Sequence, residues 1–363
     1  MATYRYLFAD LLTNNIIAEL DMTGVSFTQT LNAAGTFQGH ILISGLSPAA
    51  NASNATIPAK CAVYVDRDGV LVWGGVIWHR DYNSTSQTIS ITAQEFESYF
   101  NRRRIAATVG YVLTDQLTIA QNLIRTAQAS TNGNIGVAVG NETSGVLVNR
   151  TYYNYELKTV YSALQDLSQQ QTGFDFNIHV AYDGGGIPSK TLILSYPQSG
   201  VRYSSTSLSA PVLEFPAGNI AEYSYPEDGS VAANTIYTVG AGSNEGKLIL
   251  TATDAAKLTA GWPLLEDSIN YSDIVDTTVL TSLGNGRIAA VSYPPTTLQV
   301  VSPPYVNPTL GSYNIGDDFR IRITDDRFPT GLDAIYRLVA LNVQAGESNS
   351  PERVTLTLSL PTS

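Results

Sequence analysis

The sequence predicts an α+β fold, mostly β, in which two β domains flank an inserted mixed α/β domain. Residues 1–95 consist of short runs rich in β-branched and aromatic residues, and turn signals separate several of them. Between 96 and 207, apolar residues recur with helical period in two segments, and a strictly alternating stretch follows. From 208 to 363 the β character resumes. The order along the chain is therefore β, α/β, β.

The first domain, residues 1–95, is expected to be barrel-like, because short and closely spaced strands favour a barrel or sandwich over a parallel sheet. Whether strands from 208–239 complete this domain is left open. The stretch 46–59 predicts a polar loop, and Asp66 to Gly69 ("DRDG") predicts a tight hairpin turn. The expected strands cover 14–22, 24–32, 36–44, 60–65, 69–79 and 86–93.

The inserted domain, residues 96–207, is expected to begin with a helix. Thr92 and Glu95 have the spacing of a capping box, and the arginines at 102–104 would close this helix at its negative end. Two further helices are expected within 114–130 and 155–173, the second capped by Gly173, and a hairpin is expected over 174–196.

The third domain, residues 208–363, is expected to be a second barrel-like β domain. A helical segment is predicted near 273–291, and an extended linker is predicted at 292–304. The chain then closes with a three-strand meander, in which apolar residues alternate from Phe319 onwards. The remaining expected strands cover 212–215, 220–225 and 234–242.

The low charge content fits a protein with much of its surface in permanent contacts. Charged residues make up 14% of the chain, against roughly 25% in ordinary soluble domains. The net charge of −11, from 31 acidic and 20 basic residues, has the wrong sign for a dedicated nucleic-acid binder. It is compatible with a passage through which DNA slides without binding.

Cys61 is the single cysteine, and it alternates with Val63 and Val65, so a buried thiol is expected. One cysteine forms no intrachain disulfide and no cysteine cluster for a metal. We expect no signal peptide, because the N-terminus lacks a basic region followed by an apolar run. We also expect no membrane segment, because no apolar stretch approaches roughly 18–20 residues.

The residue pattern does not indicate an enzyme, a cofactor or a metal site. His79 is close to Asp81, but no nucleophile elbow, zinc-binding histidine pair or Cys-His set accompanies it. The stretch 240–248 imitates a phosphate loop with the wrong glycine spacing, so a glycine-rich turn is expected there. Carboxylates such as Asp317 and Asp318 leave paired glycosidase acids open, because such acids need not be close in sequence.

Residues 71–82, "LVWGGVIWHRDY", are predicted to form a wall that meets another protein chain. Trp73 and Trp78 would face opposite sides of a regular strand, and a one-residue bulge at Gly74–Gly75 would place both indoles on one side. The two glycines are expected to bend the strand at a barrel corner or to let another backbone approach closely. The arginines at 102–104 offer a phosphate site as one interpretation. The favoured interpretation is that they complement a helix end and pair with an acidic neighbour, which a second copy of the chain could supply. The interface candidates are Trp73, Gly74, Gly75, Trp78, Arg80, Asp81, Arg102, Arg103 and Arg104.

Several stretches together resemble the tail hub proteins of long-tailed bacteriophages. Val70 to Ile105 carries the first match, and "SFTQTLNAAGTFQGHI", "VYSALQDLSQQQTGFDFNIHV", "NPTLGSYNIGDDFRIRITDDRFP" and "YRLVALNV" carry the others. They cover essentially the whole chain in matching order. In siphophages such chains are minor tail proteins, and the same module forms the N-terminal part of many tail-associated lysins.

The resemblance implies a structural virion protein, the tail-tip (baseplate) hub, assembled as a homotrimeric ring with two β-barrel-like hub domains in each subunit. Such a hub would be made in the cytoplasm of the host bacterium. It would cap the tail tube beneath the distal tail protein, contact the tape-measure protein and other minor tail proteins, and gate the DNA channel. The chain ends at Ser363 after its last expected strand, so no lysin domain and no enzymatic activity are expected.

Two other functions are weighed against the hub. The 21 tyrosines and a neutral polar surface suggest a glycan- or receptor-binding tail-tip protein as the alternative. A cell-wall hydrolase is suggested only by the lysin relatives of the family.

Overall fold

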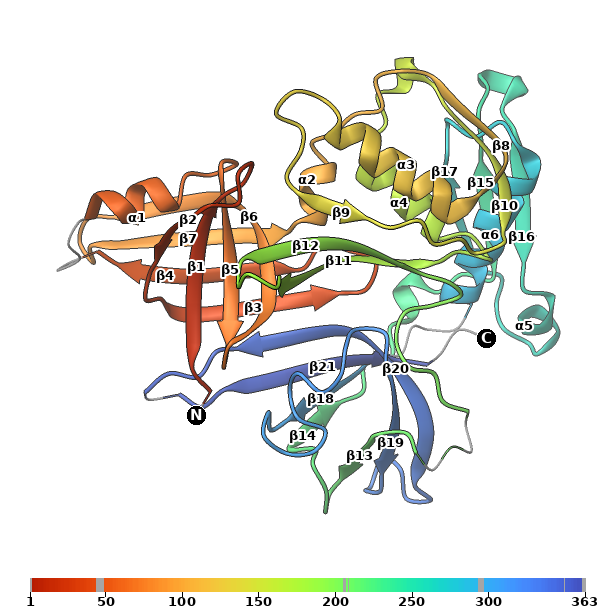
Figure 1. Ribbon diagram of the computed structural model, residues 1–363. Coiled ribbons are helices and arrows are strands. Elements are labelled where there is room, and N and C mark those ends of the chain that lie inside the picture. Colours follow the sequence, from red (N-terminus) through yellow and green to blue (C-terminus); the bar gives the residue numbers. More distant parts are fainter. Residues whose placement is uncertain are drawn as a thin grey trace.

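The computed structural model describes residues 2–43, 49–204, 207, 209–292, 297–348 and 350–360. Its main feature is a 13-stranded sheet built from both ends of the chain, with helices and smaller sheets of the middle part packed on one side (Figure 1). The mostly β class expected from the sequence is confirmed.

The first 95 residues supply one half of this sheet, in the order β3-β4-β7-β6-β5-β1-β2. Asp68 and Gly69 have φ angles of 54° and 87°, so the tight turn predicted at "DRDG" is confirmed. Strand β1 was not expected, because four consecutive residues of it are buried and no polar alternation marks it. The strands are β1 (Tyr4–Asp10), β2 (Ile16–Glu19), β3 (Thr23–Thr30), β4 (Thr36–Leu42), β5 (Cys61–Arg67), β6 (Val70–Asn83) and β7 (Thr88–Glu95).

The last part of the chain supplies the other half, and the long strand β20 (Leu332–Gln344) joins the two. Its first part pairs with β19 (Asp318–Ile323), its last part pairs with β3, and β21 (Arg353–Ser359) runs along its other side. The predicted closing meander is confirmed. Two separate barrels are not observed, because β20 hydrogen-bonds to strands of both halves and the described strands of the two halves form one 13-stranded sheet.

The strands of 208–239 pair away from the first half of the sheet. β13 (Val212–Phe215) pairs with β19, and β14 (Glu222–Ser224) pairs with β18 (Thr297–Ser302). Strand β18 occupies part of the stretch 292–304 that was expected to be an extended linker, and residues 293–296 lie outside the described residues. That expectation was wrong, because Leu298, Val300 and Ser302 alternate as buried residues of a paired strand.

The inserted domain places two helices over a three-stranded sheet of β11, β12 and β9 (Figure 1). Asp115 and Thr159 cap the helices, because each side chain accepts a hydrogen bond from a backbone N–H of the first turn. The two predicted helices and the hairpin are confirmed. The elements are β8 (Val109–Asp115), α3 (Gln116–Gln128), β9 (Val137–Val139), β10 (Leu147–Tyr152), α4 (Val160–Ser168), β11 (Asp175–Tyr182) and β12 (Pro188–Ser195), with a 3-10 turn at Asn154–Glu156.

Three local expectations were wrong. The capping box at Thr92 and Glu95 does not form, because β7 extends through Glu95 and leaves only the short helix α2 (Glu97–Phe100). Helix α4 ends at Ser168, so Gly173 is not its cap. Helix α1 (Ala49–Ala55) lies in the predicted loop 46–59, of which residues 46–48 are outside the described part, because two alanines of the helix pack into the main core.

A further small unit follows β14. Its three-stranded sheet has the order β16-β15-β17 and packs on α6 (Thr277–Val291), which confirms the helical segment predicted near 273–291. The glycine-rich stretch 240–248 forms the predicted turn, with a 3-10 turn at Asn244–Gly246. The other elements are β15 (Thr235–Val239), β16 (Ile249–Thr253), α5 (Ala255–Thr259), β17 (Glu266–Asn270) and a 3-10 turn at Gly229–Val231.

This small unit is attached to the inserted domain by buried charges. Arg150 of β10 approaches Asp273 at 2.7 Å, and Lys158 approaches Asp166 at 2.6 Å and Asp273 at 2.9 Å. The guanidinium and ammonium groups hold the pKa of Asp273 below its usual range in spite of its burial. The unit therefore belongs structurally with 96–207, although it lies within the predicted third domain, 208–363.

Two large cores lie on the two faces of the first half of the sheet. One cluster combines strands of both halves, from Tyr6 to Leu358, and contains Cys61, whose predicted burial is confirmed. The other cluster fills the space between β1, β5 and β6 and the inserted domain. The division of the chain into folding domains at 1–95, 96–207 and 208–363 stays a prediction.

Candidate interaction surfaces

Trp73 lies in the core that both halves of the sheet share. Its side chain is 0% exposed, its ring stacks on Phe37 with centroids 5.3 Å apart, and its Nε1 donates to the carbonyl of Thr28 at 2.9 Å. Because contacts within the chain already surround this indole, it is not available to a second chain.

The bulge predicted at Gly74–Gly75 is wrong in position. These two residues pair regularly with Tyr64 and Val63. The register shifts instead at Val72, opposite β5, and at Trp78, opposite β7. The two indoles therefore point to opposite faces, Trp73 into the main core and Trp78 toward the inserted domain.

The two glycines do allow the close backbone approach that the sequence suggested, but the approaching strands belong to the same chain. A Cβ on Gly75 would lie 2.2 Å from the carbonyl oxygen of Gln94 in β7 and 2.5 Å from the ring of Trp73. A Cβ on Gly74 would lie 3.0 Å from Val180 of β11. Both glycines are buried, so they pack the sheet against its neighbours.

Replacing Gly75 with alanine is expected to lower the free energy of unfolding by about 1–3 kcal/mol, because the methyl group overpacks a fixed backbone. Chemical denaturation of the purified protein measures this. The matched control is Gly184→Ala in the turn between β11 and β12, where an added Cβ meets nothing within 4 Å. Equal stability of the two variants would contradict the packing role of Gly75.

Of the remaining interface candidates in 71–82, two contact other parts of the chain and one lies at the surface. Trp78 is partly buried and donates from Nε1 to Ser98 Oγ at 2.8 Å. Arg80 donates to Thr56 Oγ1 at 3.1 Å, at the residue that follows helix α1. Asp81 is exposed.

The arginines at 102–104 follow α2 in a turn. Arg103 donates to the carbonyl of Ala127 at 2.9 Å and is partly buried. Arg102 and Arg104 are exposed, and Arg104 donates to the carbonyl of Leu157 at 3.3 Å. Of the predicted interface residues, Asp81, Arg102 and Arg104 therefore present the most surface to a partner, and this role stays a prediction.

Strand β2 is one end of the main sheet, and its outer edge is open. Leu20 N donates to Tyr6 O of β1, so alternation in an antiparallel pair directs the backbone groups of Glu19 away from β1. Ile17 lies at an irregular position of this pairing, between Ala18 opposite Phe8 and Ile16 opposite Ala9. Helix α1 lies beside β2, yet no hydrogen bond among the described residues reaches this edge. Ile16 and Ile17 are 44% and 37% exposed. An open edge with apolar side chains is a surface that a further strand can complete.

Strand β14 is the opposite end of the sheet and is also paired on one side only. The third end, β13, is closed. Asn219 accepts from Glu214 N at 2.9 Å and donates to Val212 O at 2.8 Å, so its amide takes the place of a neighbouring strand. The open ends β2 and β14 therefore differ from the closed end β13 in their capacity to pair with another chain.

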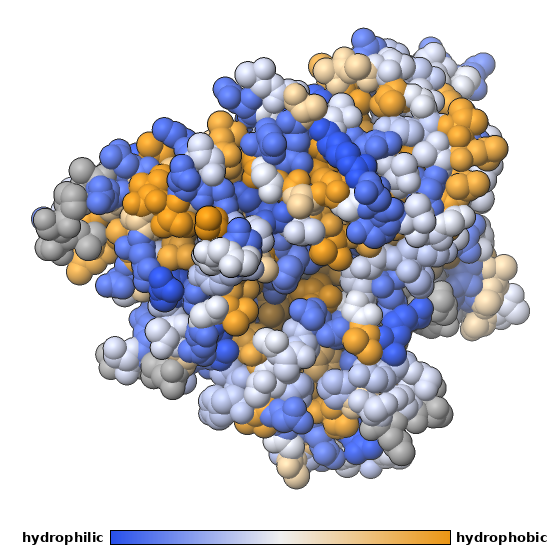
Figure 2. All heavy atoms as spheres, in the orientation of Figure 1, coloured by the Kyte–Doolittle hydropathy of each residue, from blue (hydrophilic) through white to orange (hydrophobic). Residues whose placement is uncertain are grey.

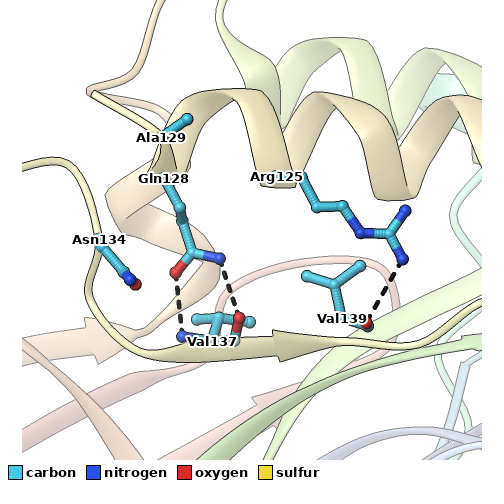
Figure 3. Close-up of a pocket in the computed structure, with 6 residues that line it drawn as sticks. All are labelled: Arg125, Gln128, Ala129, Asn134, Val137 and Val139. Atoms are coloured by element: carbon cyan, nitrogen blue, oxygen red, sulfur yellow. Dashed lines mark hydrogen bonds between the residues drawn. The ribbon is translucent and has the colours of Figure 1, made fainter.

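The edge of β9 is closed in the same way (Figure 3). Gln128 of α3 donates to Val137 O at 2.9 Å and accepts from Val137 N at 3.0 Å, and Arg125 reaches Val139 O at 3.4 Å. Beside these contacts lies a shallow depression of about 300 Å³, to which Ala129 and Asn134 also contribute. The polar side chains that line the depression are already hydrogen-bonded to the backbone of β9. Their presence therefore does not indicate a ligand site.

An apolar surface lies on the two-stranded ribbon of β8 and β10. Val112 is 78% exposed, Leu113 is 68% exposed, and Leu147 on the neighbouring strand is also exposed. Leu113 has a φ of 46°, at an irregular position of the ribbon, and its N–H is bonded to Asn149 Oδ1 at 2.8 Å. Figure 2 shows apolar residues gathered over this region, at the upper right. A leucine held in the left-handed region with its side chain in solvent marks a candidate contact surface.

The junction of the two sheet halves with the inserted domain contains a buried ion pair. Arg337 of β20 pairs with Asp175 of β11, and both side chains are 8% exposed. Asn32, in the turn between β3 and β4, donates to Asp175 Oδ1 at 2.9 Å. Ser199 N donates to Asp175 Oδ2 at 2.6 Å, and the carbonyl of Ser199 accepts from Arg337 at 3.0 Å. The ion pair thus connects segments far apart in the sequence.

Within the ranges that the structure describes, no three or more His, Cys, Asp and Glu side chains are grouped so that they could hold a metal ion. In the same ranges no helix has the length and apolar character needed to cross a membrane.

No protein-family model matches the sequence, and no curated protein sequence matches it. Solved structures do match. The 43 kDa tail protein of prophage MuSo2 from Shewanella oneidensis has a TM-score of 0.59 at 13% identity, with 99% of each chain covered. A tail protein from Neisseria meningitidis has a TM-score of 0.58 at 13% identity, with 98% of this chain and 96% of that chain covered.

The chain has the fold of phage tail proteins. The same tail-protein fold is found at a TM-score of 0.50 and 11% identity in the Escherichia coli c3393 protein, a component of the type VI secretion system similar to the T4 tail proteins gp27 and gp5. That match covers 95% of this chain and 74% of the other. At these identities the likeness concerns the fold.

Proposed function

We propose that this protein is a structural component of a bacteriophage tail, the hub at the tail tip of a long-tailed phage. The observation that carries the proposal is the agreement of fold over the whole length of two tail proteins, with at least 96% of each chain covered. The agreement therefore includes the inserted domain and the small unit as well as the main sheet. A tail-tip location in the virion, after synthesis in the cytoplasm of the host bacterium, is part of this proposal.

The open ends of the main sheet support assembly as a ring of three copies. The two ends, β2 and β14, differ in sequence and in position, so pairing an end of one copy with the sheet of the next is a head-to-tail contact. Such contacts close into rings when the rotation between copies is a simple fraction of a turn. A trimer would remove both open edges and would explain why they lack the side-chain closure found at β13 and β9.

The remaining partners follow from the same proposal. A ring at the tail tip caps the tail tube beneath the distal tail protein, contacts the tape-measure protein and other minor tail proteins, and gates the DNA channel. The net charge of −11 suits a channel wall that repels phosphates. The apolar ribbon of β8 and β10 and the exposed Asp81, Arg102 and Arg104 are the surfaces offered to these partners.

Replacing Ile17 with lysine is expected to abolish the trimer while leaving the monomer folded, because a charged side chain on an edge strand opposes pairing. Native mass spectrometry is expected to show three times the 39.0 kDa chain mass for the wild type and one chain mass for the variant. The control is Val70→Lys, at a residue 63% exposed on β6, in the part of this strand that pairs with β5 and lies away from the open edge of β2. A monomeric wild-type protein that binds host cell walls would favour the glycan- or receptor-binding alternative instead.

A further inference from the structure

A lysine occupies a core position of the inserted domain. In β12, Lys190 alternates with Leu192 and Leu194, and all three residues are buried. Lys190 is 1% exposed, and its Nζ lies 4.8 Å from the ring centroid of Phe96. No Asp or Glu that the structure describes forms an ion pair with it. A buried ammonium group without a carboxylate is disfavoured in a dry site, so the other contacts of Nζ decide its chemical state.

The nitrogen of this lysine contacts the side-chain amide of Asn14, in the turn between β1 and β2. Lys190 Nζ lies 3.1 Å from Asn14 Oδ1. The hydroxyl of Tyr64, a residue that is 0% exposed, donates to the same oxygen at 2.6 Å. Asn14 Nδ2 donates to the carbonyl of Pro188, at the start of β12. Two donors on one oxygen fix the orientation of the amide, so its carbonyl faces Lys190 and Tyr64 and its nitrogen faces Pro188.

This cluster contains the reacting groups of an amide exchange. The amine is the nucleophile, and the carbon that it attacks, Cγ of Asn14, is covalently bonded to the oxygen that Nζ already contacts. The O–H of Tyr64 points at the atom on which negative charge develops when this carbon becomes tetrahedral. Burial lowers the pKa of Lys190 to about 8, which increases the fraction of neutral, nucleophilic amine at neutral pH. Reactants held together in this way favour the step.

We propose that Lys190 and Asn14 form an intramolecular isopeptide bond, which joins the first half of the main sheet covalently to the inserted domain. The neutral Nζ attacks Cγ of Asn14, and an electron pair of the C=O bond moves to Oδ1, where the hydroxyl of Tyr64 stabilises it. As the C=O bond re-forms, the bond from Cγ to Nδ2 breaks with its electron pair. One proton of Nζ passes to Nδ2, which leaves as ammonia. The step consumes no oxidant, no reductant and no second reactant.

The bond joins residues that are 176 positions apart and fixes the β1–β2 turn against β12. The chain has a single cysteine, so no intrachain disulfide supplies a covalent connection between these parts. A cross-link that closes a long loop stabilises the folded protein mainly by restricting the unfolded chain. Because the bond forms within one chain, it does not depend on the proposed role as a tail hub.

Intact mass spectrometry of the denatured full-length protein tests the bond. The wild-type mass is expected to lie about 17 Da below the mass calculated from the sequence, because one molecule of ammonia is lost. Lys190→Met removes the nucleophile, keeps an apolar side chain in the core and is expected to have the full sequence mass. A succinimide formed at an asparagine loses the same mass as the isopeptide bond, but its deficit would remain in Lys190→Met. This variant therefore separates the two reactions.

Asn14→Gly is the second variant, because glycine readily adopts the φ of 60° found at this position. It is also expected to have its full sequence mass, and it replaces Lys190→Met if that protein does not fold. The matched control is Lys247→Met, at an exposed lysine, which is expected to keep the deficit. Tyr64→Phe keeps the ring and removes the donor, so it is expected to form the bond about 100-fold more slowly. An equal rate would exclude the hydroxyl from the step.

A tryptic digest of the wild-type protein locates the bond without any variant. Trypsin does not cleave after a lysine whose amine is acylated, so the expected product joins residues 6–60 to residues 159–202. A wild-type protein with its full sequence mass would overturn the proposal, and so would a digest that is cleaved after Lys190 and yields separate peptides. A mass deficit that persists in Lys190→Met would overturn it as well.

Discussion

Replacing Arg337 with alanine is expected to lower the free energy of unfolding by about 3–5 kcal/mol, because it leaves Asp175 as an unpaired charge in a buried site. Both side chains of the pair are 8% exposed. The same change removes the hydrogen bond to the carbonyl of Ser199 and one to the carbonyl of Gly316 at 3.2 Å. The loss is therefore concentrated at the junction of β20, β11 and the β3–β4 turn.

Denaturant unfolding followed by tryptophan fluorescence measures this effect, since Trp73 and Trp78 lie in the adjoining cores. The matched control is Arg322→Ala, which removes a 39% exposed arginine from an ion pair with Asp333 and is expected to cost less than about 1 kcal/mol. Replacing both partners, with Arg337→Met and Asp175→Leu together, is expected to recover most of the loss. A loss below about 1 kcal/mol for Arg337→Ala would show that the junction does not depend on the pair.

Replacing Trp73 with alanine is expected to lower the free energy of unfolding by about 3–5 kcal/mol, the range found when a large aromatic side chain is removed from a core. The substitution empties a site that is closed on all sides, removes the stacking on Phe37 and leaves the carbonyl of Thr28 without its donor. Trp73→Phe is expected to cost less, because it keeps most of the buried volume and loses the hydrogen bond.

The same unfolding experiment measures the Trp73 variants, with Tyr305→Ala as the control. Tyr305 is 79% exposed, so its truncation is expected to change stability by no more than about 0.5 kcal/mol. A Trp73→Ala protein that keeps its stability and loses only its assembly would restore Trp73 to an interface between chains.

Helices and strands whose apolar residues recur at regular spacing, and turns with typical turn residues, could be predicted from the sequence. The alternation of Phe174 to Tyr182 and the helical period within 116–128 identify their elements because one face is buried and the other is solvated. The turn at "DRDG" is identified by local chemistry, since Asp68 and Gly69 accept positive φ.

Elements whose environment comes from distant residues could not be predicted. Four consecutive residues of β1 are buried because β1 is covered on both faces. Its sequence therefore lacks the alternation of apolar and polar residues that marks a half-exposed strand. Helix α1 is stabilised by alanines packed into a core that the sequence does not reveal. The spacing of Thr92 and Glu95 satisfies a capping box, but the pairing of β7 with β4 and β6 extends the strand through this site.

The candidate site shows the same division. The aromatic and glycine content of 71–82 correctly marks a place where backbones approach closely, but it does not say which chain supplies the neighbour. The structure supplies β7 and β11 of the same chain. The open edge of β2 depends on the strand order of the folded sheet, which no local pattern indicates. The closed edges at Gln128 and Asn219 involve residues only five to nine positions apart, but they are recognised as edges only once the strand order is known.

A structure of the assembled protein by electron cryo-microscopy, from purified rings or from tail tips of virions, tests the account most directly. The expected result is three copies around an axis, with the backbone of Glu19 in β2 hydrogen-bonded to a strand of the neighbouring copy. A single self-contained chain, with the outer edge of β2 in solvent at concentrations where virions assemble, would contradict it.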